Sequence, residues 1–454
     1  MGALAKFDVS RNDLCAEGGK AIAEALKNNQ VMTDLNISRN DLSLDFYANM
    51  DMSGVIAICN AISTMGALER LIMSNNHLVG NGPVAGKALA EALAAHTTLK
   101  ELDLSGNYTG GYDVNAGEFA KEFAVGLRAN GALVSANLLK NGIDVERART
   151  LATVLKEHAT LKSLCGHKGD ETKLDMSGKR IGPAGAIMLA PEIAANGALT
   201  DLNIGDNGLN NGGSGLQEIC PVIAASKITS LDISGNHANL NRGTEAIVEM
   251  VKNNGAPSLV TFDIGTNELR AGGAKALAKA LKDHHVLQKL NIANNQLILK
   301  DDAKKVSDID PSGIIAISEA ISTMRALAIL DISHNYVSDH VACKQLWAAS
   351  VQRVVSRIVI SITSTDPYMT PFHVIDGFFE TSPLRDLHSY QIAIGLRSRV
   401  LIARRSTRGK KRKRSPQEGG GGEPMAVDEI PAAGPWRWQL PLPQEVFCRA
   451  LLWL

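Results

Sequence analysis

The sequence predicts an α/β solenoid, a fold in which short parallel strands and helices alternate along a stack of similar units. Two observations carry this prediction. The pattern L-x-x-L-x-L-x-x-N-x-L returns eleven times, and its clearest copies begin at Leu99, Leu199, Leu259 and Leu287. Each copy is followed by apolar residues at helical spacing. Because one unit cannot bury its own apolar face, stacked neighbours have to complete the core.

The elements follow this pattern in chain order. Its alternating leucines predict a short strand with one row of side chains pointing inward and the residues between them pointing to the other face. The segments after the strands, such as 21–26 and 274–281, predict amphipathic helices. The remaining copies begin at Leu4, Met32, Leu68, Leu133, Ile228 and Leu327, and a degenerate copy lies between Leu161 and Ile181.

An asparagine recurs where the chain leaves each strand and turns inward. Such a turn leaves backbone donors and acceptors unpaired, and a side-chain amide carries both kinds of group. We therefore expect a stacked asparagine column that satisfies these groups from unit to unit and has a structural role. Its members are Asn12, Asn40, Asn76, Asn107, Asn141, Asn207, Asn236, Asn267, Asn295 and Asn335.

These units resemble the ribonuclease-inhibitor-like class of leucine-rich repeats over residues 1–342. The resemblance implies a horseshoe with a parallel β-sheet on the concave side and α-helices on the convex side. Members of this class include inhibitors, nucleotide-sensor receptors and activators of Ran-type GTPases. The fold is thus shared by unrelated tasks, and the resemblance alone does not specify a function.

The composition is that of a protein that uses most of its residues for packing. Of its residues, 45% are apolar, 4% aromatic and 21% charged, and the formal net charge is zero. Balanced charge gives no reason to expect nucleic acid as a partner. No segment approaches the roughly 20 continuous apolar residues that span a bilayer, and residues 1–14 already lie within a repeat rather than a signal peptide. We therefore expect an intracellular, cytoplasmic protein without a membrane partner.

No constellation of residues points to catalysis. The sequence contains no phosphate-binding loop, no serine nucleophile elbow and no H-E-x-x-H motif, so we expect neither enzymatic activity nor a cofactor. The six cysteines lack C-x-x-C spacing, which predicts reduced thiols and no metal site. His96, His158, His284 and His285 fall at expected helix ends and are interpreted as cationic caps, whereas His167 is interpreted as an ordinary loop histidine.

The concave strand face is expected to carry a polar, acidic stripe. Ten of the eleven residues between the second and third apolar positions are Asp or Asn, and only Ile72 differs. Such a stripe steers basic partners and repels phosphate backbones. The same residues recur in this repeat class for structural reasons, which is the interpretation we favour. Basic residues nearby make the surface mixed in sign and suited to a protein partner. The candidate contact residues are Lys6, Asp8, Arg39, Arg70, Lys100, Asp103, Asp232, Asp263, Lys289 and Asp331.

Four irregular segments interrupt the repeats, at residues 43–54, 108–115, 165–173 and 298–311. Insertions in solenoids often lie on the binding side, but loop growth also costs little free energy, and we favour neutral growth. The aspartates of the last segment lack the spacing of a calcium-binding loop. Segments 51–78 and 310–337 are far more similar to each other than the other units are, which indicates duplication of a block.

Beyond residue 342 the repeat pattern ends. We divide the rest into an unassigned module (343–403), a disordered basic and glycine-rich linker (404–439) and an amphipathic terminus (440–454). The linker contains a run that resembles a nuclear-localisation signal and implies a nuclear import receptor as a partner. The alternative is a solubilising or RNA-touching tail. The core of the run is Lys410, Lys411, Arg412, Lys413 and Arg414.

The two ends of the chain raise a separate expectation. The terminus LPQEVFCRALLWL resembles the opening helix of an F-box, which would imply a substrate receptor of a ubiquitin ligase. A complete F-box is longer, and in that family it usually precedes the repeats. No polar cap precedes the repeat at Leu4, although solenoid ends normally carry one. Either the chain is a fragment or a gene-model fusion, or a partner covers its uncapped end; we favour the first interpretation.

Taken as a sequence, the chain is interpreted as an α/β leucine-rich-repeat solenoid with a concave parallel sheet, convex helices and an irregular or disordered C-terminal tail. The expected function is that of a non-enzymatic scaffold that binds a protein partner through the concave face and loops. One alternative is a GTPase activator of the Ran type, with a small GTPase as partner. The other is the F-box substrate receptor.

Overall fold

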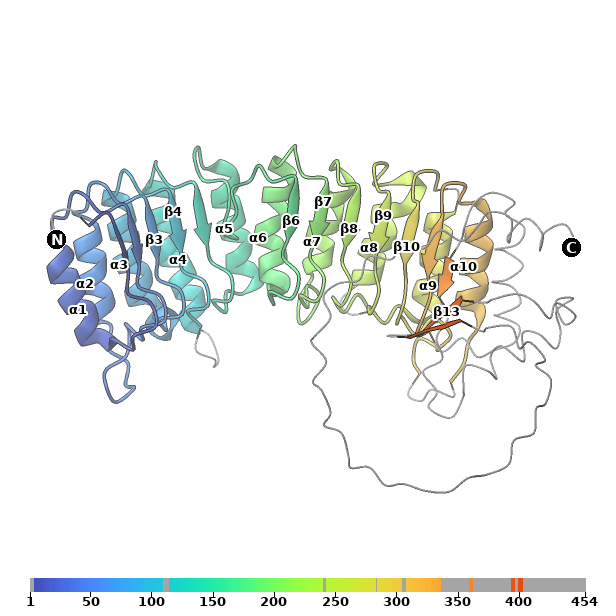
Figure 1. Ribbon diagram of the computed structural model, residues 1–454, viewed down its shortest axis with the longest axis horizontal. Coiled ribbons are helices and arrows are strands. Elements are labelled where there is room, and N and C mark those ends of the chain that lie inside the picture. Colours follow the sequence, from blue (N-terminus) through green and yellow to red (C-terminus); the bar gives the residue numbers. More distant parts are fainter. Residues whose placement is uncertain are drawn as a thin grey trace, which may run out of the picture. The chain divides into compact units, whose positions relative to one another are not determined.

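Strands form one layer of the repeats and helices form the other (Figure 1). The computed structural model describes residues 4–108, 114–239, 242–282, 284–303 and 308–335, together with the backbone of β12 (Val359–Ser361), β13 (Ala393–Leu396) and β14 (Arg399–Ile402). The sequence assignments for 343–403, 404–439 and 440–454, including the basic run 410–414, lie outside the described residues apart from these three strands.

Eleven strands and ten α-helices alternate along the described repeats. The strands are β1 (Lys6–Asp8), β2 (Asp34–Asn36), β3 (Arg70–Ile72), β4 (Glu101–Asp103), β5 (Ser135–Asn137), β6 (Lys173–Asp175), β7 (Asp201–Asn203), β8 (Ser230–Asp232), β9 (Thr261–Asp263), β10 (Lys289–Asn291) and β11 (Ile329–Asp331). The helices are α1 (Cys15–Leu26), α2 (Ser53–Ile62), α3 (Gly82–Ala95), α4 (Val114–Ala129), α5 (Val145–Glu157), α6 (Gly182–Ala195), α7 (Gly215–Ala224), α8 (Gly243–Val251), α9 (Arg270–Leu281) and α10 (Ser312–Thr323), with short 3-10 turns at η1 (Leu78–Asn81) and η2 (Lys252–Asn254).

The strands pair in parallel, in two separate sheets. One sheet has the order β1-β2-β3-β4-β5, and the other has the order β12-β11-β10-β9-β8-β7-β6. The register places the central residues of neighbouring strands side by side, as with Leu35 beside Leu71 and Leu202 beside Leu231. The repeat pattern implied one parallel sheet, so the division between β5 and β6 is a feature that the pattern did not reveal.

The hydrophobic core lies between the two layers and is continuous from Ala23 to Ile332. The middle residue of each strand points into it; Phe262, for example, is fully buried. Each helix adds a face of small and branched residues, such as Ala274 and Leu277 of α9. A three-residue strand is not stable alone, so every unit depends on the neighbours that cover its apolar residues.

The ten asparagines form two columns beside the strands, and all but the exposed Asn12 are buried. Asn236 Oδ1 accepts the backbone N–H of Asn207, in the preceding unit, at 3.1 Å. Its Nδ2 donates to the carbonyl oxygens of Ile204 (2.9 Å) in the preceding unit and Ile233 (3.0 Å) in its own. One column joins Asn12, Asn40, Asn76, Asn107 and Asn141, and the other joins Asn207, Asn236, Asn267, Asn295 and Asn335.

The columns also hold a strained turn in place. The residue before each of the ten asparagines has a positive φ, and only Gly106 and Gly235 among these residues are glycines. Lys140 (φ 61°) and Thr266 (φ 57°) adopt the same left-handed conformation, which costs an ordinary residue about 1–2 kcal/mol. Such strain persists only where the surroundings over-determine the backbone, and the asparagine hydrogen bonds supply that restraint.

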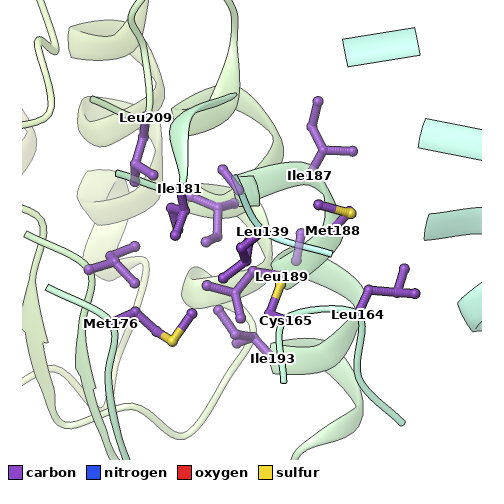
Figure 2. Packing of buried hydrophobic residues seen from close by; sticks show 14 of the residues in the cluster. Leu139, Leu164, Cys165, Met176, Ile181, Ile187, Met188, Leu189, Ile193 and Leu209 are labelled. Atoms are coloured by element: carbon purple, nitrogen blue, oxygen red, sulfur yellow. The ribbon is translucent and has the colours of Figure 1, made fainter. Parts of the chain in front are cut away.

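The division between the sheets coincides with the degenerate repeat. Segment 163–165 forms isolated bridges to β5, and the chain then continues to β6 without an intervening helix. In the other units the column asparagine lies four residues after the end of the strand. After β6 this position is Lys179, so the column is interrupted at the same place. The core nevertheless continues across the division, where Figure 2 shows Leu139, Ile181 and Leu189 in one buried group.

The column predicts a large and position-dependent loss of stability on truncation. Asn236→Ala leaves the buried N–H of Asn207 and the carbonyls of Ile204 and Ile233 without these partners. We expect the free energy of unfolding, measured by urea denaturation followed by circular dichroism, to fall by about 2–4 kcal/mol. Asn12→Ala, at the exposed first rung, is the matched control and should cost less than about 1 kcal/mol. Equal losses in the two variants would contradict the structural role of the buried column.

Candidate protein-binding surface

The solvent-exposed face of the sheets, which the sequence predicts to be the concave face and which we call the outer strand face, presents two side chains from each strand. The middle residue enters the core, whereas the first and third residues are exposed or half-buried, as in β3 and β10. The candidate residues at first positions are Lys6, Arg70 and Lys289, and those at third positions are Asp8, Asp103, Asp232, Asp263 and Asp331. Lys100 immediately precedes β4, and Arg39 lies in the left-handed turn after β2 (φ 56°).

Several charges on this face are paired with the neighbouring strand. Lys6 Nζ lies 3.4 Å from Asp34 Oδ2, and Arg70 Nε lies 3.1 Å from Glu101 Oε2. The same alternation recurs as Lys100 with Glu69 (2.8 Å) and Lys173 with Asp201 (3.3 Å). Exposed pairs of this kind contribute little to stability and exchange partners easily. The face is therefore mixed in sign, and its charges are accessible to another protein.

The Asp and Asn residues at the third position of the strands also hydrogen-bond the backbone. All ten Asp and Asn residues there accept the backbone N–H of the residue two positions later; Asp103 accepts from Ser105, and Asp232 from Ser234, both at 2.9 Å. The other eight are Asp8, Asn36, Asn137, Asp175, Asn203, Asp263, Asn291 and Asp331. The bond closes a local turn that takes the chain out of each strand. The stripe thus stabilises the turns and also shapes the charge of the outer face.

An acidic patch stands out on the second sheet. Burial raises the pKa of Asp263, and the negative charges of Asp232 and Asp331 raise it further. The amide of Asn291 partly offsets this by donating to Asp263 Oδ2 at 2.8 Å. Because these carboxylates repel one another, a cationic group placed over β8, β9 and β11 would be stabilised by all three.

A second polar column, which the sequence analysis missed, lies where the chain returns from helix to strand. Asn130 Oδ1 accepts the N–H of Leu133 at 2.7 Å, and its Nδ2 donates to the carbonyl of Leu93, in the preceding unit, at 2.8 Å. Asn196 and His158 make the same kind of bond at equivalent places. The signal in the sequence was an Asn or His three residues before the first leucine of a repeat.

The interpretation of the buried histidines as cationic caps is wrong for His96 and His284. His96 Nδ1 accepts the N–H of Leu99 at 3.1 Å, and His284 Nδ1 accepts the N–H of Leu287 at 3.2 Å. Burial lowers the pKa of both histidines below the ordinary value of 6.5. Neutral rings that accept hydrogen bonds therefore replace the expected cations.

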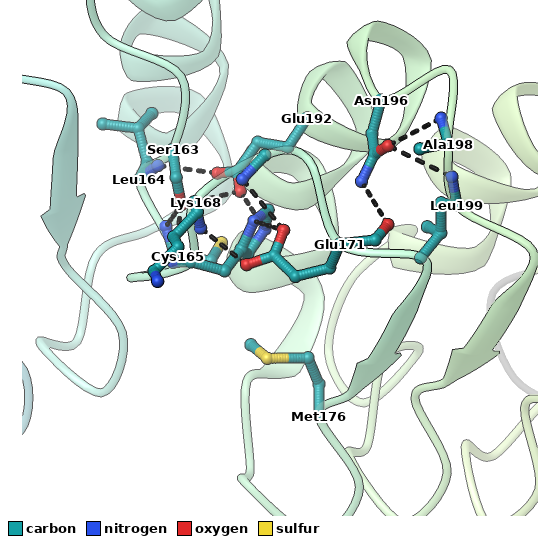
Figure 3. A network of polar contacts seen from close by, with 12 residues as sticks. Ser163, Leu164, Cys165, Lys168, Glu171, Met176, Glu192, Asn196, Ala198 and Leu199 are labelled. Carbon is teal, nitrogen blue, oxygen red and sulfur yellow. Dashed lines mark hydrogen bonds and ion pairs between the residues drawn. The ribbon is translucent and has the colours of Figure 1, made fainter.

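The division between the sheets contains a buried polar network (Figure 3). Glu192 of α6 is 1% exposed and accepts the backbone N–H of Leu164 at 2.7 Å and the hydroxyl of Ser163 at 2.9 Å. The same carboxylate forms an ion pair with His167 Nε2. His167 Nδ1 lies 3.5 Å from Glu171 Oε2. The network thus joins the segment that ends the first sheet to a helix that packs behind the second.

The interpretation of His167 as an ordinary loop histidine is therefore wrong. Its side chain is 8% exposed. Burial alone would lower its pKa, but the hydrogen bond and charge of Glu192, with the charge of Glu171, raise the pKa above 6.5. The available signal was Glu192 within the otherwise apolar segment 182–195, because a buried acid requires a partner.

Three further properties concern the described residues alone. No group of three or more His, Cys, Asp or Glu side chains there is arranged to hold a metal ion. Among the helices in the described part of the chain, none combines the length and the apolar character needed to cross a bilayer. Cys59 and Cys220 are fully buried thiols, and burial raises the pKa of each to about 12.

Comparison with protein-family models identifies one repeat of this kind. A family model described as Leucine Rich repeat matches residues 95–107, which include β4 and Asn107. No curated protein sequence matches the chain. Among solved structures, the leucine-rich repeat-containing protein LegL7 from Legionella pneumophila is 16% identical, with 83% of this chain and 98% of that chain covered and a TM-score of 0.30. The described repeats form an α/β leucine-rich-repeat solenoid.

The buried ion pair predicts a titration that depends on Glu192. We expect His167 to titrate above pH 6.5 in NMR spectra of its labelled imidazole, and Glu192→Gln to lower that pKa because burial then outweighs the remaining charge. Since the folded-state pKa is raised, the stabilisation is complete below pH 6.5 and is lost as the pH rises through the folded-state value. An unchanged pKa in the variant would show that Glu192 does not hold the proton on His167.

Proposed function

We propose that this chain is a non-enzymatic scaffold that binds a protein partner through the outer strand face and the loops. The supporting observation is that the positions of each three-residue strand have different roles. The middle side chain and the asparagine after the strand fix the backbone, while the exposed or half-buried first position differs from strand to strand, as Lys6, Glu101 and Thr261 show. A rigid backbone with variable exposed side chains suits recognition, because little conformational freedom is lost on binding.

The charge pattern supports a partner with a mixed but partly basic surface. The acidic patch of Asp232, Asp263 and Asp331 favours Lys or Arg groups on the partner. The exposed Lys289 and the paired Lys6 and Arg70 offer sites for acidic groups elsewhere on the face. Such complementarity selects among partners and sets their orientation more than it adds affinity.

A charge reversal on the strand face tests this proposal. Lys289→Glu changes an exposed first-position side chain of β10, and Lys279→Glu makes the same change on the exposed side of α9. In affinity purification from native extract followed by mass spectrometry, we expect the first variant to retain about a tenth of the partner bound by the wild type. The second variant should retain all of it. Equal losses, or no loss from Lys289→Glu, would contradict binding by the strand face.

The same purification separates the alternatives. A small GTPase retained by the repeats, with accelerated GTP hydrolysis, would support activation of the Ran type. Ligase subunits that require 440–454 would support the F-box reading of the terminus. The scaffold proposal itself requires only a partner that depends on the strand face.

We also propose that a nuclear import receptor reads the basic run 410–414. Changing Lys410, Lys411, Arg412, Lys413 and Arg414 to Ala in a fluorescent fusion of the full chain should lower the nuclear-to-cytoplasmic ratio severalfold. A version in which each Lys becomes Arg and each Arg becomes Lys keeps the charge and should keep the ratio. An alanine variant that accumulates in the nucleus like the wild type would contradict import through this run.

A further inference from the structure

Two large aromatic side chains project from an ordered loop near the start of the chain. Phe46 and Tyr47 are 88% and 81% exposed. Their rings touch only edge to face, with centroids 5.7 Å apart and an interplanar angle of 87°. Met50 of the same loop is also exposed. Exposed aromatic residues that are held together in this way are typical anchors of protein–protein contacts.

The loop that carries these rings is a closed hairpin, residues 43–51, which we call the aromatic hairpin. Leu44 and Met50 form an antiparallel bridge at its base. At its tip, Asp45 Oδ1 accepts the backbone N–H groups of Tyr47 and Asn49, each at 2.8 Å. The side-chain amide of Asn49 donates to Asp45 Oδ2 at 2.9 Å. The tip is therefore pre-organised, which lowers the entropy lost when a ligand binds.

The duplicated block provides an internal comparison. An equivalent antiparallel bridge, between Leu299 and Ile309, precedes the second copy. Each bridge is tied to the preceding helix through one backbone bond, from Ala16 to Leu44 (2.8 Å) and from Ala271 to Leu299 (2.9 Å). The frame is thus the same, but residues 300–308 read KDDAKKVSD and include no aromatic residue. The fold requires the frame and does not require Phe46 or Tyr47.

Carboxylates surround the base of the aromatic hairpin. The backbone N–H of Leu44 donates to the carbonyl of Asp41 at 2.8 Å, which places Asp41 at this base. Burial raises the pKa of Cys15, and the charges of Asp41, Asp13 and Asp45 raise it further. Asp51 lies at the other end of the hairpin, where hydrogen bonds from Ser53 hold its pKa below the usual value and keep it ionised. The local field is therefore negative, which disfavours phosphate backbones and anionic lipid surfaces as ligands.

One nearby cation, Lys20, offsets this field only in part, since its charge helps to lower the pKa of Asp51. Its Nζ lies 2.6 Å from Glu17 Oε1, so its charge is engaged by that carboxylate. His77 Nε2 lies 3.0 Å from Asp41 Oδ1 and satisfies part of one acid. The charges of Asp13, Asp45 and Asp51 can still attract a cation on a partner.

We propose that the aromatic hairpin binds an arginine-bearing peptide segment of the partner protein. A guanidinium group is flat, stacks on aromatic rings and forms paired hydrogen bonds with carboxylates, so one side chain engages both features of the hairpin. The inference deepens the proposed scaffold function by naming the chemistry recognised by one loop. It concerns a surface other than Lys289, so either site can fail in its test while the other holds.

The test uses the full-length chain and a fluorescein-labelled peptide of alternating arginine and glycine, with fluorescence anisotropy at near-physiological salt. We expect Phe46→Ala/Tyr47→Ala to raise Kd about ten-fold. Val125→Ala removes an apolar side chain of α4 that is 59% exposed and should leave Kd unchanged. Because both rings are exposed, melting curves from circular dichroism should match those of the wild type. Failure of the wild type to bind, or equal Kd for the double variant, overturns the proposal.

Two further arms distinguish stacking from simple charge attraction. A peptide with lysine in place of arginine should bind severalfold more weakly, since an ammonium group cannot stack as a flat guanidinium does. Asp13→Asn keeps a residue type that tolerates the left-handed backbone at this position (φ 47°) and should weaken arginine-peptide binding about three-fold. Equal affinity for the two peptides would overturn the role of the rings, and an unchanged Kd in Asp13→Asn would overturn the role of the carboxylates.

Discussion

The satisfaction of backbone groups in the turns after the strands is the constraint on which the rest of this structure depends. Each unit is too small to bury its own apolar residues, and each turn leaves backbone donors and acceptors inside the protein. The asparagine columns pair those groups across units. Asn236, for example, bonds the carbonyl of Ile204 and the N–H of Asn207, both in the preceding unit. Packing and hydrogen bonding therefore act between the same neighbours, and neither could be completed within one repeat.

The division between β5 and β6 shows what happens where this constraint is not met in the usual way. The column lacks an asparagine at Lys179, and the strand pairing stops. At this place a carboxylate takes up a backbone N–H that no further strand pairs with: Glu192 accepts from Leu164, the middle residue of the segment bridged to β5, and from the hydroxyl of Ser163. Burying that charge requires a cation, and His167 supplies it. The core remains continuous while the sheet does not.

Much of the fold followed from the sequence, because a repeated pattern reports the same local structure many times. The strand positions, the helices and the α/β leucine-rich-repeat class are confirmed by the structure. What the pattern could not give was anything that occurs once. The contact between Glu192 and His167, which are 25 positions apart, arises from packing at one place in the chain, so the repeat period could not predict it. The neutral state of His96 depends on burial, which the local sequence does not show. Likewise, the exposure of Phe46 and Tyr47 depends on how the hairpin closes.

The account places recognition on a rigid strand face, and hydrogen–deuterium exchange tests that claim most directly. The full chain would be compared alone and bound to the partner that the wild type recovers. The account predicts slower exchange on binding in peptides that cover strands and their following turns, such as 261–267 and 289–295, with no change in the helices 182–195 and 270–281. Slower exchange confined to the helices, with the strand peptides unchanged, would contradict it.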